Sequence, residues 1–393
     1  MPHPNTTQVI NAWLNYHGIR SSSVSTTHGG AWLTVTDVLV SKANQLLGAS
    51  YQLYRNSKTN DTIIRTVGYA LPAVLHEHIK TVAPTTYFAS KRVTPQAPPK
   101  RSFRAAPAQA QSGTGNVVTA LASRDDGVWP DLLRWLYETG EYVLSAGGQN
   151  RLAVLGLQGQ FPSPEDFTGF MKDFDETATF TVVQVNGGVN NPTNPSKQAN
   201  ADIQYAAAMS FPTPVFFYSV GGDLADDAFL HWFSYILNPA QLNIPQTISI
   251  SYGDYEPNLP VEYALAVCLL FMHLGSRGVS VLVASGSEGV GPGDCEDGDG
   301  NVKFVPEFPS SCTCGVQSPL PVTRLGQVQV AHQTAIFTGP WVTSVGGTTG
   351  NPEVAASLSG GGFSTYFPYP MYQFDAVDQY LQNHGGNHAS RYK

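Results

Sequence analysis

A hydroxyl and a carboxyl stand together where a predicted strand ends. The stretch "GVSVLVASGSEGVG" (278–291) begins as an apolar strand and continues into a glycine-broken turn that carries Ser287 and Glu288. Catalytic groups gather at the carboxyl ends of strands in parallel sheets, so Ser287 as a nucleophile is one interpretation. A nucleophile elbow, G-x-S-x-G, would need glycine at the position of Ser285. The alternative is a small-residue turn that only ends the strand.

A second polar pair lies on a predicted helix. In "KQANADIQYAAAM" (197–209), Gln198 and Asp202 are four residues apart and therefore share one helix face. A pair of carboxyls at this spacing could transfer a proton, because each shifts the pKa of the other. Glutamine cannot titrate, so on spacing alone the pair is either a simple polar face or a catalytic pair that lacks one acid.

Two loops that could bind ligands do not have the required spacing. In the acidic loop "GDCEDGDGN" (293–301), an EF-hand frame starting at Asp297 would place Val302 sixth and Phe308 twelfth. The glycine-rich stretch "SGGGFSTYFPYP" (359–370) has no following lysine and no strand-turn-helix frame, so it is not a phosphate loop. We predict no metal site here; the glycine-rich stretch could pack closely or line a substrate.

Composition places these residues in a globular chain with two domains. The chain has 393 residues, of which 42% are hydrophobic and 13% are charged. No apolar run reaches the roughly 18 residues that a membrane span needs, and the N-terminus shows no signal peptide. We therefore expect no membrane association by the chain.

Charge is distributed unevenly along the chain. Residues 1–104 contain 11 Lys and Arg against 3 Asp and Glu, whereas residues 105–393 contain 10 against 26. This asymmetry is either chance variation of the surface or a basic segment docked on an acidic partner. Basic residues are not clustered with aromatic ones, so we do not predict nucleic-acid binding.

The elements that must position these groups divide into three parts. Residues 1–90 alternate short helices and strands and predict a small α+β domain. Residues 91–126 are rich in Pro, Ala, Ser and basic residues and predict a linker that a protease could cut. From 127 to 393, apolar strands alternate with helices, which predicts an α/β domain with a doubly wound parallel sheet. The predicted strands are 152–157, 180–185, 215–220, 247–253, 279–285 and 341–347.

One segment interrupts this alternation. Residues 313–339 show neither helical nor strand periodicity and separate "FPSSC" from "PWVTSVGG". Long structureless loops are uncommon in compact domains, so we interpret the segment as an insertion.

Several motifs in this order resemble one family. "SISYGDYE", "GVSVLVASGSEGVG", "FVPEFPSSC", "WVTSVGGT" and "SGGGFSTYFPYPMYQ" are similar to stretches of the sedolisin (S53) serine-carboxyl peptidases, especially fungal tripeptidyl peptidases. Residues 1–90 resemble the pro-domain of that family, of the pro-kumamolisin type. The resemblance implies a subtilisin-like fold and a secreted, monomeric zymogen that cleaves peptides at acid pH.

The implied catalytic groups are a serine nucleophile, a glutamate base, an aspartate that orients the base, and a second aspartate that stabilises the oxyanion. Asp202 matches the orienting aspartate, whereas Gln198 occupies the position of the glutamate base. Ser287 stands where the oxyanion aspartate belongs, and Glu288 is one residue away. The G-T-S-x-x-x-P motif that would bear the nucleophile does not occur before Lys393. The calcium ligands of the family are likewise expected beyond that end.

These differences predict that the chain as written does not hydrolyse peptides. Losing one member of such a catalytic unit usually costs several powers of ten in rate. The leading hypothesis is an acid peptidase represented by a truncated, inactive chain, in which the ends and the insertion are gene-model errors. The alternative is a pseudo-peptidase that binds peptides or a related enzyme. A hydrolase that uses Ser287 as nucleophile is the third possibility.

We expect different states for the four cysteines. The resemblance implies a disulfide between Cys295 and Cys312, which leaves Cys314 unpaired. Cys268 lies in a strongly helical pattern and is expected to be a buried, inert thiol. An extracellular location follows from the family; the sequons at Asn5 and Asn60 agree with it, although such triplets are frequent.

Overall fold

The computed structural model describes most of both predicted domains. The residues described are 5–26, 30, 32–57, 60, 62–88, 128–140, 144, 149–173, 177–192, 195–222, 227–238, 240–291, 304–312, 341–349, 353–368 and 370–386. The predicted linker (91–126), the acidic loop (293–301), the predicted insertion (313–339), Cys295 and Cys314 lie outside these residues.

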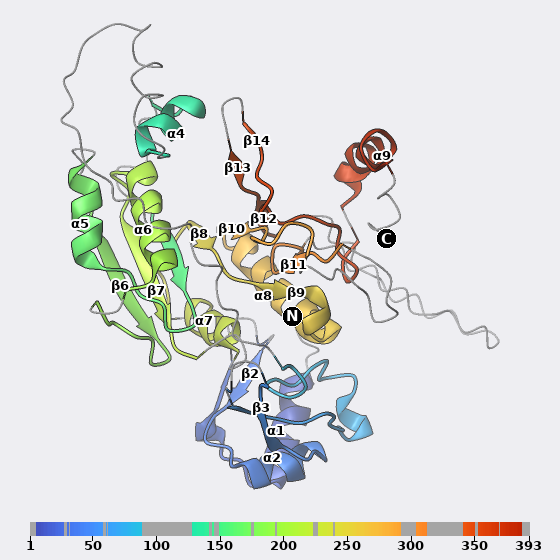
Figure 1. Cartoon of the computed structure of the whole chain (residues 1–393). Helices are drawn as coiled ribbons and strands as arrows, with labels where there is room; N and C mark the ends of the chain where they lie inside the picture. The colour runs from blue at the N-terminus through green and yellow to red at the C-terminus, as the bar shows by residue number, and fades with distance from the viewer. Residues whose placement is uncertain are drawn as a thin grey trace, which may run out of the picture.

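The N-terminal unit combines helices with two hairpins and is drawn in blue in Figure 1. Its elements are α1 (Thr6–Tyr16), β1 (Val24–Thr26), β2 (Leu33–Val35), α2 (Val40–Leu47), β3 (Gln52–Arg55) and β4 (Thr62–Arg65). β1 pairs with β2 and β3 with β4, both antiparallel. The unit has a core of its own, which includes Ile10, Leu14, Leu46, Leu47 and Leu75. The predicted α+β domain is confirmed.

The larger unit is built on a parallel sheet of six strands. These are β5 (Leu152–Gly156), β6 (Phe180–Val185), β7 (Val215–Val220), β8 (Thr247–Ile250), β10 (Ser280–Ala284) and β12 (Thr343–Val345). The order across the sheet is β12-β10-β8-β5-β7-β6, and every neighbouring pair is parallel. Each predicted strand segment contains one of these strands.

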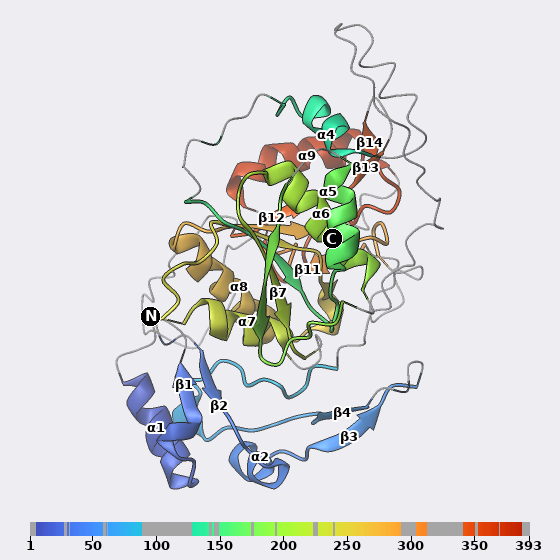
Figure 2. The same cartoon turned by 90° about the vertical axis from the view of Figure 1, so that its left-hand side faces the viewer.

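Helices cover both faces of this sheet. α5 (Pro164–Lys172) and α6 (Lys197–Ser210) lie on one face, and α7 (Ala228–Ile236) and α8 (Val261–Ser276) on the other (Figure 2). Side chains of β5 alternate accordingly: Val154 joins the core under α5 and α6, whereas Ala153 and Leu155 join the core under α7 and α8. The predicted doubly wound sheet is therefore confirmed.

Shorter elements surround the sheet. β9 (Asp254–Tyr255) pairs antiparallel with β11 (Glu307–Phe308), and β13 (Thr348–Thr349) pairs with β14 (Val354–Ala355). Helices α4 (Pro130–Leu136) and α9 (Phe374–Asn383) follow the same pattern of short outer elements, and α9 lies apart from the six-stranded sheet in Figure 1. In the described part of the chain, no helix combines the length and the apolar character that crossing a membrane requires.

The two units share buried contacts. Tyr87, near the end of the N-terminal unit, is 5% exposed and belongs to the core beneath α7 and α8. Its hydroxyl donates to Asp254 Oδ2 at 3.1 Å, and its ring stacks on Tyr263 of the larger unit. Within the N-terminal unit, its carbonyl accepts from Arg65 Nε at 2.8 Å. Burial, followed by the nearby Asp254, raises the pKa of Tyr87, so the hydroxyl is a donor. The N-terminal unit is thus anchored in the core of the larger one.

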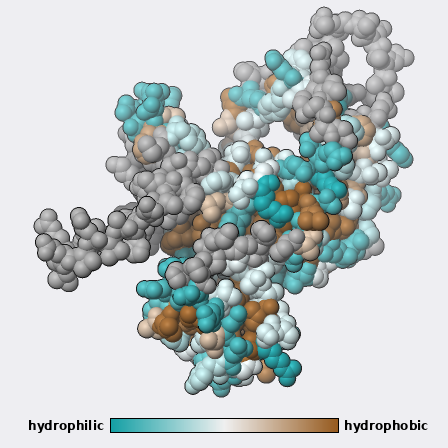
Figure 3. Space-filling model, turned by 180° about the vertical axis from the view of Figure 1, so that it is seen from behind, coloured by the Kyte–Doolittle hydropathy of each residue, from teal (hydrophilic) through white to brown (hydrophobic). Residues whose placement is uncertain are grey.

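Apolar patches occur on the face of the molecule that is turned away from the viewer in Figure 1. In Figure 3, apolar patches occur on the lower unit and on the larger unit above it. Exposed apolar side chains of the N-terminal unit include Leu53 on β3 and Ile64 on β4.

Candidate active site

Helix α6 positions the predicted polar pair. Ser196 caps its N-terminus by accepting from the Ala199 amide at 2.9 Å, and the Ser196 hydroxyl donates to Gln160 Oε1 at 2.8 Å. Ala199 and Ile203 are buried against the sheet. This packing fixes the rotation of the helix, so the side chains of residues 198 and 202 share a more exposed face.

The structure brings Gln198 and Asp202 together. Gln198 Nε2 donates to Asp202 Oδ1 at 2.8 Å, as the i, i+4 spacing predicts. The same carboxyl oxygen accepts from Ser251 Oγ at 3.1 Å, just beyond the end of β8. Asp202 is therefore held between its own helix and the carboxyl end of a central strand.

The second oxygen of Asp202 is buried without a partner. Oδ2 makes no hydrogen bond, and burial raises the pKa of Asp202 from 3.8 to about 6, against the opposing effect of the bonds from Ser251 and Gln198. Tyr252, next to Ser251, is also buried, and burial followed by the charge of Asp202 raises its pKa. The site can thus hold a proton on Asp202 under mildly acidic conditions.

Ser287 lies in an exposed turn after β10. The Ser285 amide donates to the Val345 carbonyl at 2.9 Å, and the Gly360 amide donates to the Gly286 carbonyl at 2.9 Å. Gly286 has a φ of +117°, which favours glycine. Within the described residues, no hydrogen bond joins Ser287 to Gln198 or Asp202. The predicted strand-ending turn is present, but a nucleophile-base contact is not.

The Glu288 side chain contacts the strand pair formed by β9 and β11. It accepts a hydrogen bond from the hydroxyl of Tyr255 on β9. The carboxyl that follows Ser287 is therefore tied to β9.

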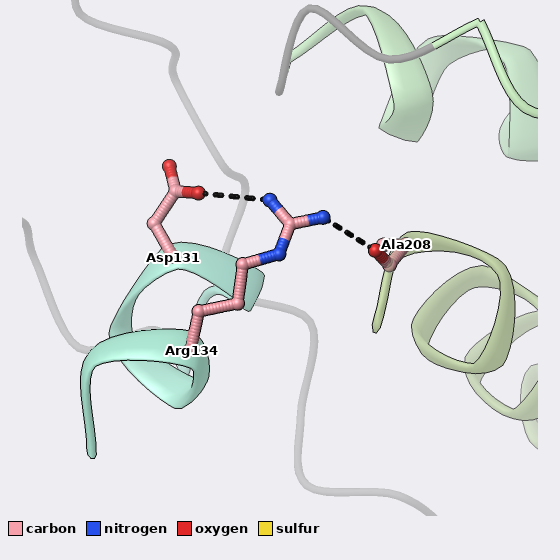
Figure 4. Close-up of polar contacts among 3 residues, drawn as sticks. All are labelled: Asp131, Arg134 and Ala208. Carbon is pink, nitrogen blue, oxygen red and sulfur yellow. Dashed lines mark hydrogen bonds and ion pairs between the residues drawn. The ribbon is translucent and has the colours of Figure 1, made fainter. Parts of the chain in front are cut away.

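Helix α4 contacts the C-terminal end of α6. Arg134 donates to the Ala208 carbonyl at 2.6 Å and also contacts Asp131 at 3.4 Å (Figure 4). A guanidinium beside the last carbonyls of a helix satisfies them and complements the helix dipole. The Tyr205 hydroxyl donates to the Val128 carbonyl. The segment that follows the predicted linker therefore braces the helix that carries Asp202.

The chain is similar to a known family model and to several curated proteins. Residues 1–88 match the family model described as "Pro-kumamolisin, activation domain". The chain is similar to "Tripeptidyl-peptidase SED2" of Arthroderma otae, with 31% identity over 405 residues that cover 97% of this chain and 62% of that protein. It is also similar to "Tripeptidyl-peptidase sed4" of Aspergillus fumigatus, with 31% identity over 376 residues that cover 90% of this chain and 57% of that protein. These matches bear out the resemblance to the sedolisin family that the motifs indicated.

One solved structure carries the family name. "Pseudomonas sedolisin (serine-carboxyl proteinase) complexed with two molecules of pseudo-iodotyrostatin" has 16% identity and a TM-score of 0.42, covering 64% of this chain and 66% of that chain. The chain spans 62% of the length of the first curated relatives it matches.

The predicted disulfide is corrected by the structure. Cys312 is joined to Cys268 on α8, with Cα atoms 5.7 Å apart, and not to Cys295. Both residues are buried in the core beneath α7 and α8, where the segment after β11 packs on α8. The expectation that Cys268 is an inert free thiol was therefore also wrong.

Glu256 and Glu307 are buried carboxyls that were not recognised from the sequence. Glu256 has no exposed surface and accepts from Ser364 Oγ and from the Thr365 amide at 2.9 Å, which fixes the glycine-rich stretch 359–370. Glu307 is 7% exposed and lies in β11. The glutamate inside the apolar stretch "FVPEF" was the available signal for Glu307.

The family also implies calcium. Among the described residues, no group of three or more His, Cys, Asp or Glu is arranged to hold a metal ion. These residues do not fit the ion, and we derive no step through it. A surface hollow of about 430 Å³, lined by Arg151 and Gln246 among others, lies at the opposite, amino ends of β5 and β8.

Proposed function

We propose that this sedolisin-family protein binds peptides at the carboxyl ends of β8 and β10 without hydrolysing them through the pair on α6. The observation that carries the proposal is the hydrogen bond from Gln198 Nε2 to Asp202 Oδ1, 2.8 Å long. A general base must accept a proton from the attacking hydroxyl, and an amide cannot do so at any ordinary pH. The pair keeps the geometry of a carboxyl dyad without its chemistry.

Peptide ligands are supported by the relatives, which are named tripeptidyl-peptidases. We propose the organisation that the sequence suggests: a pro-domain at 1–90, a processed linker at 91–126 and a peptidase-type domain from 127 onward. Secretion belongs to the same proposal. Calcium, where the complete protein binds it, would use ligands outside the described residues.

Slow hydrolysis with Asp202 as the only base is the second candidate. Its Oδ2 is buried without a partner, and its pKa is raised to about 6, so the carboxylate could accept a proton in mild acid. The two candidates predict different behaviour when residues 198 and 202 are changed.

The test uses the complete protein encoded by the gene and a chromogenic tripeptide anilide at pH 4 to 6. We expect no turnover above that of Asp202→Asn, and a gain of at least about 100-fold in Gln198→Glu, because a positioned base typically contributes that much. Ala201→Asp adds a carboxyl at an exposed position of the same helix, outside the pair, and should gain nothing. Turnover in the wild type that Asp202→Asn abolishes would favour the second candidate. Binding of the uncleaved peptide, measured in parallel, should occur in wild type and variants alike.

A further inference from the structure

The hollow at the amino ends of the central strands contains two arginines. Its volume is about 430 Å³, within the range of roughly 300 to 1,000 Å³ that is usual for small-molecule sites. Arg151 directly precedes β5, and Arg277 lies between α8 and β10. The peptide site proposed above lies at the carboxyl ends of these parallel strands, so the hollow is a separate feature on the opposite edge of the sheet.

Both guanidinium groups lie against the segment that leads into β8. Arg151 Nη1 donates to the Asn243 carbonyl at 3.4 Å, and Arg277 Nη2 donates to the Gln241 carbonyl at 3.1 Å. These carbonyls are two residues apart, so at most about 7 Å of chain separates their Cα atoms. Each bond uses one N–H, and a guanidinium carries several more. The two side chains thus converge on one short segment and keep donors for a ligand.

Arg151 is held in place by its surroundings. Its guanidinium carbon lies 5.5 Å from the centre of the Phe216 ring. Its main-chain amide donates to Gln246 Oε1 at 2.7 Å, and the main-chain amide of Gln246 donates to the Arg151 carbonyl at 3.1 Å. A guanidinium fixed over an aromatic face is pre-organised, which lowers the conformational entropy that is lost when it binds an anion.

Neither arginine forms an ion pair with an acid in the part of the chain that the structure describes. Arg134, by contrast, lies 3.4 Å from Asp131. Acids are plentiful in the larger unit, since residues 105–393 contain 26 Asp and Glu against 10 Lys and Arg. Even so, none of the described residues that line the hollow is acidic. Two positive charges in a hollow without acids favour a ligand with negative charge.

The donors in the hollow indicate which anion it would bind. Guanidinium groups bind phosphate through paired N–H···O bonds, and a phosphate ester carries about two negative charges and several acceptor oxygens near pH 7. One phosphate could therefore accept from both arginines. The hollow is also lined by Gln149 and Asn150, whose side-chain amides suit the hydroxyl groups of a sugar.

We propose that Arg151 and Arg277 form a binding site for a phosphate group at the amino ends of β5, β8 and β10, with room for the sugar of a sugar phosphate. The site is independent of the peptide-binding function proposed above. Inorganic phosphate and a sugar phosphate share the chemistry that the arginines recognise, and the experiment distinguishes them.

The test is isothermal titration calorimetry of the complete protein with glucose 6-phosphate at pH 7 and constant ionic strength. Inorganic phosphate and glucose are titrated separately. We expect saturable binding of one glucose 6-phosphate per chain and no binding of glucose. Inorganic phosphate that binds at least as tightly as the ester would identify the free ion as the ligand, whereas weaker binding of the free ion would identify a sugar phosphate.

Variants connect the binding to the hollow. Arg277→Gln removes one exposed guanidinium and should weaken binding by at least about tenfold, because hydrogen bonds to a charged group contribute that much. Lys172→Gln, on exposed surface at the end of α5, loses the same charge outside the hollow and should leave the affinity unchanged. Leu242 lines the hollow and is 85% exposed. Leu242→Asp adds a negative charge there and should weaken binding by a similar factor, whereas the uncharged counterpart Leu242→Asn should retain it.

Arg277 and Leu242 are both exposed, so these variants should fold like the wild type, which thermal melting checks. Leu242→Asp changes neither arginine and therefore tests the site independently of Arg277→Gln. The proposal is overturned if the wild type shows no saturable binding of either phosphate compound. It is also overturned if Arg277→Gln or Leu242→Asp binds as tightly as the wild type.

Discussion

The raised pKa of Asp202 predicts a specific pH dependence of stability. Its folded-state pKa is about 6 and its ordinary value is 3.8, so the folded protein holds this proton more tightly than the unfolded chain. No penalty exists below pH 3.8, and the penalty grows as the pH rises until it is complete above pH 6. The full effect is about 3 kcal/mol, most of which develops between pH 4 and pH 7.

Asp202→Asn isolates this contribution. Asparagine keeps an oxygen that can accept from Gln198 and Ser251, but places an amide nitrogen where Oδ2 has no partner. That unsatisfied donor costs about 1 to 3 kcal/mol at every pH. The variant should therefore be less stable than the wild type at pH 4 and should recover relative to it by about 2 kcal/mol at pH 7.

The assay is urea denaturation of both proteins at half-unit steps from pH 4 to pH 7. Asp375→Asn, on exposed surface of α9, is the matched control, and its difference from the wild type gives the background for losing one carboxyl. The reasoning is refuted if the difference between wild type and Asp202→Asn changes with pH no more than that background.

Three other contacts can be tested directly. Non-reducing peptide mapping should recover Cys268 joined to Cys312, and reduction should lower the free energy of unfolding by about 4 kcal/mol, because the bond spans a separation of 44 residues; a peptide that joins Cys312 elsewhere would contradict the structure. Tyr87→Phe removes the buried hydroxyl bonded to Asp254 and should cost about 2 kcal/mol in urea denaturation, with an unchanged midpoint as the contrary result. Gly286→Ala should lower stability by about 2 to 4 kcal/mol in thermal melting, because its φ is +117° and its Cβ would collide with a carboxyl; a neutral substitution would show that the turn can move.

The parallel sheet could be predicted from the sequence because its strands are buried on both faces and therefore read as apolar runs. Segments such as 152–157 and 215–220 are continuous apolar runs, and helical stretches lie between most of them, which is typical of a parallel sheet. The contact between Gln198 and Asp202 was predictable for a similar reason, since helical geometry alone brings residues four apart together.

Tertiary partners could not be predicted in the same way. Helical periodicity shows that Cys268 faces a core, but it does not show which loop packs on that face, so the bond to Cys312 was missed. Ser251 is one serine among several near the end of a strand, and its bond to Asp202 depends on the rotation of α6 against the sheet. Local patterns fix an element and its buried face, whereas partners depend on how elements pack.

The place of Glu307 on β11 was also not predictable from the sequence. β9 and β11 are two residues long and about fifty residues apart in the chain, so no local periodicity marks their pairing. That pairing nevertheless carries a carboxyl to Gly286, while α6 and β8 hold Asp202. A fold that lacks acids at positions 198 and 287 still presents two buried carboxyls at one edge, from elements other than the turn.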